Sequence, residues 1–127
     1  MTIKPIIIVS GEPYSIFLEI FFKTLKKKKI KKLKNSIIII CSKNILLSQM
    51  NKLKYKFSFK DISKDQFNLK GLNNKKINII DVNFKFKKPF DKISTNSKSY
   101  IEQCINIALN LIKKNKIKVL INGPISK

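Results

Sequence analysis

Hydrophobic positions divide the chain into short apolar runs and longer amphipathic stretches. Ile6–Val9 is an uninterrupted β-branched run, which predicts a strand buried on both faces of a parallel sheet. Ile37–Cys41 and Val119–Ile121 have the same character and predict two more buried strands. Each run is followed by a polar or glycine-containing turn, as expected where a strand leaves the sheet.

Between these runs, apolar residues recur at helical spacing. The first predicted helix follows Pro13, and its apolar face is expected to comprise Phe17, Ile20, Phe21, Thr24 and Leu25. The second follows Ser42, a good N-cap residue, and its apolar positions are Leu46, Leu47, Met50 and Leu53.

The third predicted helix, residues 99–114, has the clearest pattern. Its expected apolar stripe is Ile101, Cys104, Ile105, Ala108, Leu109 and Ile112. Ser99 and Glu102 have the spacing of a capping box, which predicts that the helix starts there. Lys113, Lys114 and Lys116 lie at the other end, where the helix dipole favours positive charge.

Two further stretches alternate apolar and polar residues. Tyr55, Phe57 and Phe59 predict a third strand with one solvated face, and the residues from Ile80 to Phe86 predict a fourth, at an edge. The polar residues 60–76 and 87–98 are expected to be loops. The order β-α-β-α-β-β-α-β predicts a three-layer α/β fold with a mainly parallel sheet and right-handed crossovers. At 127 residues, the chain is the size of one modest domain.

The turns after the first and last buried runs are the candidate site. Both follow parallel-type strands, so they should open on the same edge of the sheet, where open α/β sheets bind ligands. Glycine lets a ligand approach the backbone closely, lysine suits a phosphate, the serine hydroxyls are donors, and Glu12 can orient a lysine or a substrate hydroxyl. The candidate binding residues are Ser10, Gly11, Glu12, Pro13, Gly123, Pro124, Ser126 and Lys127. Two ordinary loops with a solvated lysine explain the same residues, and neither turn has a nucleotide-binding fingerprint.

Composition adds charge and a cellular setting. The net charge is +21, every one of the 28 basic residues is lysine, and the lysines are spread over the chain. Nucleic-acid binding is one explanation, but arginine is the usual reader of bases, and compositional drift towards lysine explains the spread.

Cys41 and Cys104 are isolated within apolar patterns, which indicates buried thiols in a reducing compartment. No apolar run reaches membrane-spanning length and the N-terminus lacks a signal-peptide layout, so we expect a cytoplasmic protein without a membrane partner.

The two turns, in this order and spacing, resemble the N-terminal part of 4-hydroxythreonine-4-phosphate dehydrogenase, an enzyme of vitamin B6 synthesis. That family opens with a strand followed by Gly-(Asp or Glu)-Pro-Ala-Gly-Ile-Gly-Pro-Glu, and this chain matches it at Gly11-Glu12-Pro13, Ile16 and Glu19. Ser15, Phe17 and Leu18 replace two family glycines and a proline. The family's later Thr-(Gly or Ala)-Pro-x-x-Lys motif resembles the stretch from Gly123 to Lys127.

The resemblance implies NAD-dependent oxidation and decarboxylation of a small phosphorylated hydroxy amino acid. It also implies a homodimer, a fold like that of isocitrate and isopropylmalate dehydrogenases, and a divalent metal held by histidines. This chain has no histidine, so we expect the metal ligands outside it and the 127 residues to be a single partial α/β domain, the N-terminal part of a longer enzyme. A non-catalytic α/β interaction module and a lysine-rich nucleic-acid binder remain alternatives.

Overall fold

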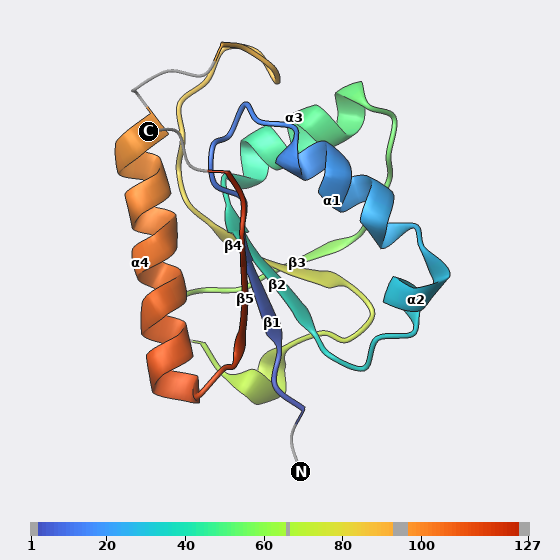
Figure 1. Cartoon of the computed structure of the whole chain (residues 1–127), viewed down its shortest axis with the longest axis vertical. Coiled ribbons are helices and arrows are strands. Elements are labelled where there is room, and N and C mark those ends of the chain that lie inside the picture. Colours follow the sequence, from blue (N-terminus) through green and yellow to red (C-terminus); the bar gives the residue numbers. More distant parts are fainter. Residues whose placement is uncertain (1–2, 66, 93–96, 125–127) are drawn as a thin grey trace.

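The computed structural model describes residues 3–65, 67–92 and 97–124, and its centre is a five-stranded sheet (Figure 1). The strands are β1 (Ile6–Val9), β2 (Ile37–Cys41), β3 (Phe59–Asp61), β4 (Ile77–Asp81) and β5 (Val119–Asn122). Their order across the sheet is β3-β4-β2-β1-β5, and every neighbouring pair is parallel. The predicted mainly parallel α/β sheet is therefore confirmed.

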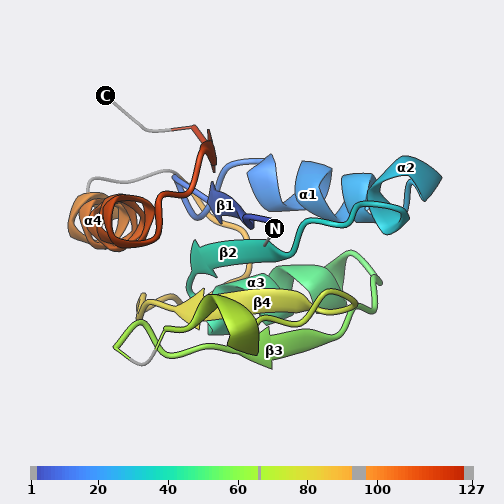
Figure 2. The same cartoon turned by 90° about the horizontal axis from the view of Figure 1, so that it is seen from below.

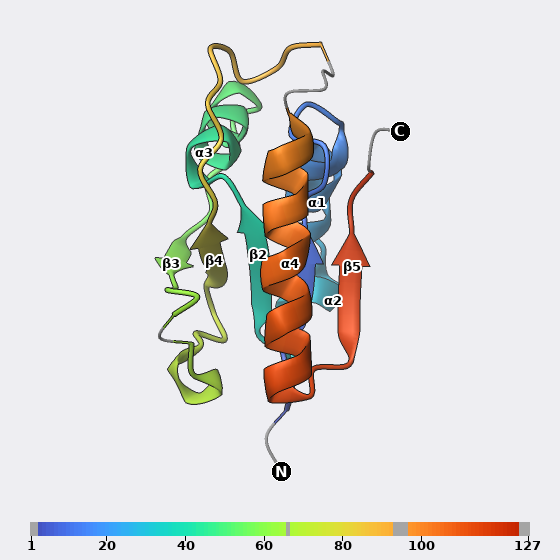
Figure 3. The same cartoon turned by 90° about the vertical axis from the view of Figure 1, so that its left-hand side faces the viewer.

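Helices cover both faces of the sheet, which gives the three predicted layers (Figure 2). The helices are α1 (Phe17–Leu25), α2 (Lys28–Lys31), α3 (Lys43–Lys52) and α4 (Lys98–Asn115), and a short 3₁₀ turn spans Leu69–Gly71. The first three lie on one face, and α4 lies alone on the other (Figure 3). The order of strands and longer helices agrees with the sequence prediction, to which α2 is an addition.

Two hydrophobic cores meet in the central strands. Ile7 and Ile38 point to the α4 side, whereas Ile8 and Ile39 point to the side of α1 and α3. Ile7, Ile38 and Ile39 are completely buried because each strand has a neighbour on both sides and a helix over each face. The continuous isoleucine runs in β1 and β2 therefore have the burial that their composition predicted.

The predicted third and fourth strands are displaced. The third strand is only Phe59–Asp61, although the expected alternation is present upstream, where Tyr55 and Phe57 are half-buried against α1 and the intervening Lys56 is exposed. The predicted fourth strand at residues 80–86 is wrong: β4 occupies Ile77–Asp81, between β3 and β2 rather than at an edge. After Asp81 the chain leaves the sheet, and its alternating apolar side chains pack on the α4 core instead.

The prediction that the last strand is buried is also wrong. Val119, Leu120 and Ile121 are 46%, 39% and 45% exposed. β5 has a partner only on the β1 side, so it forms one edge of the described sheet. Its apolar composition alone did not indicate whether a second neighbour was present.

The helix faces agree with prediction only in part. In α1, Ile20 is half exposed, whereas Leu18 and Phe22 are buried beside Phe21 and Leu25. In α4, Leu109 is half exposed, whereas Tyr100 and Leu111 join the core. Each helix is therefore rotated on the sheet relative to the face chosen from spacing, because neighbouring apolar positions compete for the interface.

Of the two predicted helix N-terminal caps, one is confirmed and one is wrong. Ser42 caps α3 as predicted, since its side chain accepts a hydrogen bond from the Ile45 amide. The capping box at Ser99 and Glu102 is wrong, because α4 begins at Lys98 and its N-cap residue is Ser97. Ser97 makes no side-chain cap and instead directs its hydroxyl to Glu12.

Candidate functional site

The two candidate turns meet at the carboxyl ends of β1 and β5, as expected from parallel neighbouring strands. Val9, the last residue of β1, pairs with Asn122, the last residue of β5. The Gly123 amide donates to the Val9 carbonyl at 2.7 Å, and the Glu12 amide donates to the Pro124 carbonyl at the same distance. Main-chain hydrogen bonds thus join the turn at 10–13 directly to residues 123–124.

Glycine is required at two points of this contact. Gly11 has φ of +72°, a conformation that strains other L-residues. A Cβ atom on Gly11 would collide with the Pro124 carbonyl, and one on Gly123 would collide with the Ser10 carbonyl. The close approach of the two backbones therefore depends on the absence of side chains at both positions.

The carboxylate of Glu12 is buried within this edge. The residue is 2% exposed, and the Ser97 hydroxyl donates to Glu12 Oε2 at 2.7 Å. Among the described residues, Glu12 Oε1 has no hydrogen-bond partner and no lysine forms an ion pair with the carboxylate. Buried polar groups are normally satisfied, so Glu12 Oε1 is an acceptor suited to a donor from a ligand or another chain segment.

Gln49 ties the first turn to a distant segment. Its side-chain amide donates to the carbonyls of Pro13 and Pro89, each at 2.8 Å. Gln49 is completely buried on α3, so this bridge is shielded from water. The bridge fixes Pro13 against both α3 and the segment that follows β4.

Buried hydroxyl and thiol groups support the α4 side of the edge. The Ser42 amide donates to the Tyr100 hydroxyl at 2.6 Å, which links the end of β2 to α4. Burial raises the pKa of Tyr100 well above its usual range and the pKa of the Cys104 thiol to about 12. Cys41 is likewise buried and its pKa is raised, which leaves both thiols unreactive. The predicted burial of the two cysteines is confirmed.

The structure brings six of the eight candidate residues together. Ser10, Gly11, Glu12 and Pro13 are buried, as is Gly123, whereas Pro124 is exposed. Ser126 and Lys127 lie outside the described residues, so the phosphate role predicted for that lysine stays a prediction.

Sequence reasoning missed Ser97, Gln49 and Tyr100. Gln49 had a usable signal, because it lies three residues after the predicted apolar position Leu46 and so shares its helix face. Ser97 had none, because its partner Glu12 is 85 positions away in the chain.

The divalent metal implied by the resemblance has no fit in this part of the molecule. Within the described ranges, no three His, Cys, Asp or Glu side chains gather in a way that could hold a metal ion. The sequence also contains no histidine.

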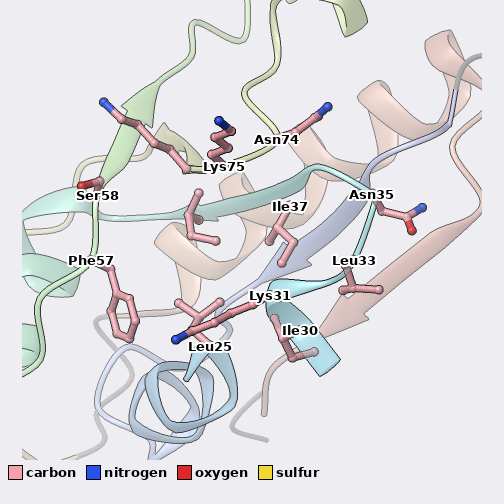
Figure 4. Close-up of a pocket in the computed structure, with 12 residues that line it drawn as sticks. Leu25, Ile30, Lys31, Leu33, Asn35, Ile37, Phe57, Ser58, Asn74 and Lys75 are labelled. Carbon is pink, nitrogen blue, oxygen red and sulfur yellow. The ribbon is translucent and has the colours of Figure 1, made fainter. Parts of the chain in front are cut away.

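A separate pocket of about 390 Å³ lies at the amino ends of the strands, where β2 and β4 begin (Figure 4). Leu25, Ile30, Ile37 and Phe57 contribute apolar surface, and Lys31 is among the basic residues that line it. None of the six candidate residues that the structure describes lines this pocket. Ligands of parallel sheets bind at the carboxyl ends of strands, so the pocket does not compete with the two turns as the candidate site.

No helix in the described part of the chain combines the length and the apolar character needed to cross a membrane.

Comparison with known proteins now adds to this geometry. The profile of the family described as "Pyridoxal phosphate biosynthetic protein PdxA" matches residues 32–127, which is most of the chain. The chain belongs to the PdxA family. This result agrees with the resemblance carried by the two turns, although the first turn lies outside the matched residues.

Individual relatives agree with the family. A putative 4-hydroxythreonine-4-phosphate dehydrogenase of Pasteurella multocida is 26% identical over 129 residues, covering all of this chain and 38% of the relative. The crystal structure of a 4-hydroxythreonine-4-phosphate dehydrogenase from Burkholderia phymatum superposes with a TM-score of 0.76 at 19% identity. The Klebsiella pneumoniae enzyme gives 0.77 at 16% identity. Both superpositions cover 98% of this chain and 38% of the neighbour, so the chain has the fold of a little over a third of these enzymes.

Proposed function

We propose that this chain provides one part of a 4-hydroxythreonine-4-phosphate dehydrogenase of vitamin B6 synthesis. The reaction is the NAD-dependent oxidation of the hydroxyl group of 4-phosphohydroxy-L-threonine to a ketone, with hydride transfer to NAD and loss of a proton. Decarboxylation of the product follows. Membership of the PdxA family and the names of the relatives support this reaction.

The observation that carries the proposal is the joined pair of turns around the buried Glu12. Their hydrogen bonds place Ser10, Gly11 and Gly123 at the carboxyl edge of a parallel sheet, the usual ligand position in α/β proteins. In the proposed site, Glu12 Oε1 orients a donor group, a lysine or a substrate hydroxyl. Ser126 and Lys127 are the proposed phosphate partners, with lysine acting as a point charge.

The remaining parts of the proposal lie outside this chain. When bound, a divalent metal would polarise the reacting oxygen, with ligands supplied by another part of the enzyme. We further propose a homodimer in the cytoplasm when the enzyme is complete. NAD is the proposed hydride acceptor, and no described residue fixes its position.

An assay of a chimera tests the proposal. Residues 1–127 are followed by the part of the P. multocida relative that lies beyond the match, and NADH formation is measured with 4-phosphohydroxy-L-threonine, NAD and divalent metals. We expect the chimera to be active and residues 1–127 alone to be inactive, because they lack a described metal site. An inactive, folded chimera would refute the proposed activity. Metal-dependent NADH formation by residues 1–127 would refute the proposal that another part of the enzyme supplies the metal ligands.

Substitution of Glu12, compared with the same substitution of a control glutamate, tests the role of Glu12. Glu12→Gln in the chimera should lower kcat/KM by about 100-fold, the usual scale for one preorganised polar contact in a site. Glu102→Gln is the control, because Glu102 is exposed on α4 and lies outside the family motifs. Equal activities of the two folded variants would remove Glu12 from the site.

A further inference from the structure

The pocket at the amino ends of β2 and β4 has an apolar wall that the core leaves partly uncovered (Figure 4). Ile30, Ile37, Phe57 and Ile77 line it, and each is only half-buried where it packs on the core beneath α1. Leu25, at the end of α1, completes the wall. With a volume of about 390 Å³, this amino-end pocket has the size of a small-molecule site.

Hydrogen bonds hold the segments that form the amino-end pocket. The Ile77 amide donates to the Ser58 carbonyl at 3.2 Å, which joins the start of β4 to the segment before β3. The Ser36 hydroxyl bonds the side-chain oxygen of Asn74, which joins the start of β2 to the segment before β4. The pocket is therefore formed by contacts within the chain and needs no ligand to shape it.

Positive charge surrounds the apolar wall. Lys31, Lys75 and Lys76 line the pocket, and no acidic residue is among its described lining residues. In the described parts of the chain, none of these three lysines forms an ion pair. Figure 4 shows Lys31 on the side of the pocket nearest α1 and Lys75 across from it. Most of residues 26–34 are also lysines, so the local potential favours an anion.

We propose that the amino-end pocket binds a small amphiphilic anion. The apolar body would lie against the leucine, isoleucine and phenylalanine side chains of the wall, and a carboxylate or phosphate group would meet the three lysines. Lysine suits this arrangement because its flexible apolar stem can lie along the wall while its ammonium group reaches the anion.

The ring contacts favour an aliphatic body over a nucleic-acid base. Phe57 already stacks with Phe22 and Tyr55, at centroid distances of 6.1 and 5.9 Å. Single-stranded nucleic acids bind through aromatic faces that are free to stack with bases. A concave pocket of this size also suits a small molecule better than a flat membrane surface. The site lies at the opposite ends of the strands from Glu12, so the inference goes beyond the proposed dehydrogenase and does not rest on it.

Titration of residues 1–127 with octyl phosphate, followed by nuclear magnetic resonance, tests the proposal. The methyl signals of Ile30 and Ile37 should shift and saturate, whereas those of Leu109 and Ile121, which are exposed elsewhere, are the controls. Octanol and inorganic phosphate each keep one half of the probe, and each should bind at least about tenfold more weakly. Equal binding of either one would overturn the proposal, as would shifts confined to the control residues.

Two triple variants of equal net charge locate the anionic group. The variant Lys31→Gln, Lys75→Gln, Lys76→Gln should weaken octyl phosphate binding about tenfold, because exposed ion pairs are individually weak and three act together. The control replaces three exposed lysines outside the pocket by glutamine, namely Lys85, Lys87 and Lys88, and should change Kd less than about twofold. Equal weakening in the two variants would mean a general attraction to the +21 chain and would overturn the proposal.

An isoleucine variant tests the apolar wall. Ile30→Ser should weaken octyl phosphate binding about fivefold and leave inorganic phosphate binding unchanged, because it removes apolar contact only. Ile20→Ser is the control, since Ile20 is 50% exposed on α1 and does not line the pocket. Thermal melting identifies folded variants. Unchanged octyl phosphate binding by folded Ile30→Ser would overturn the proposed wall.

Vesicles distinguish a free amphiphile from a membrane. Binding of residues 1–127 to phosphatidylglycerol vesicles, with no pocket shifts in octyl phosphate, would identify a membrane surface as the partner and overturn the proposal. These measurements need no enzymatic activity. An inactive chimera therefore leaves the amino-end pocket in place, and failure of octyl phosphate to bind leaves the proposed dehydrogenase in place.

Discussion

Strands β1 and β5 have almost the same sequence character and very different surroundings. Each is a short apolar run that leads to a glycine-containing turn, and they are hydrogen-bonded neighbours. Yet Ile7 and Val9 of β1 are buried, whereas Val119 and Ile121 of β5 are exposed. The difference shows that burial of a strand is decided by its number of neighbours and by the helices over it, and not by its own composition.

The same contrast extends to the turns. Ser10, Gly11, Glu12 and Pro13 after β1 are all buried, and α3 and α4 contribute Gln49 and Ser97 to hold them. After β5, Gly123 is buried against Ser10 and the Phe17 side chain, and Pro124 is exposed. The described part of the candidate site is therefore enclosed by other elements around β1 and exposed at Pro124 after β5.

Large-to-small substitutions in the two strands should show the greatest difference. Ile7→Ala should lower the free energy of unfolding by about 3 kcal/mol, because Ile7 is completely buried and leaves a cavity. Leu120→Ala should lower it by less than about 1 kcal/mol in the isolated chain. Urea unfolding monitored by circular dichroism measures both. Equal losses would mean that β5 is packed in solution and would break the comparison.

Substitution of the glycine that joins the two turns should have the next largest effect. Gly123→Ala should cost about 2 kcal/mol, because the new methyl group meets the Ser10 backbone, which cannot move like a flexible side chain. The control is Gly71→Ala, since no atom lies within 4 Å of a Cβ placed there. Thermal melting of the two variants gives the difference. If Gly123→Ala melted with the unaltered chain, the close approach of the turns would be refuted.

Removal of the hydroxyl that binds Glu12 should have a smaller effect. Ser97→Ala should cost about 1–2 kcal/mol, because a buried carboxylate loses a hydrogen-bond donor. Ser63→Ala provides a control on an exposed serine, with a change within about 0.5 kcal/mol. Equilibrium unfolding at pH 7 compares them, and a Ser97→Ala variant as stable as Ser63→Ala would show that Glu12 is satisfied in another way.

Thiol labelling should distinguish the buried core from the exposed β5 and should change stability the least. In the unaltered chain, Cys41 and Cys104 should react slowly with a thiol reagent at pH 8, because both are buried and the raised pKa of Cys104, about 12, leaves little thiolate. A Leu120→Cys variant should gain one fast-reacting thiol per chain. Fast reaction of the unaltered chain would mean that the β1 side opens readily, and slow reaction of the new thiol would mean that β5 is covered.

The raised thiol pKa also predicts how stability depends on pH. Cys104 binds its proton more tightly in the folded state than in the unfolded state, where the ordinary value is 9.0. Its contribution is therefore fully present below about pH 9 and is lost as pH rises towards 12. Cys104→Ala should flatten the fall in stability over that interval, measured as Tm against pH relative to the unaltered chain.

The sequence by itself determined the elements whose signals are local. The isoleucine runs of β1 and β2, the serine cap of α3 and the turn residues from Ser10 to Pro13 can be identified from composition and spacing, because their conformations depend on neighbouring residues. The alternation of strands and helices also specified a parallel three-layer fold. From that fold it followed that the two candidate turns would share an edge.

Only the tertiary structure decided the features that depend on distant residues. The exposure of β5 depends on its position at the edge of the described sheet, and the end of β4 at Asp81 depends on where the following residues find a core. Ser97 donates to Glu12 rather than capping α4 because folding brings them together across 85 positions. These choices follow from competition among contacts in three dimensions, which no local pattern of residues contains.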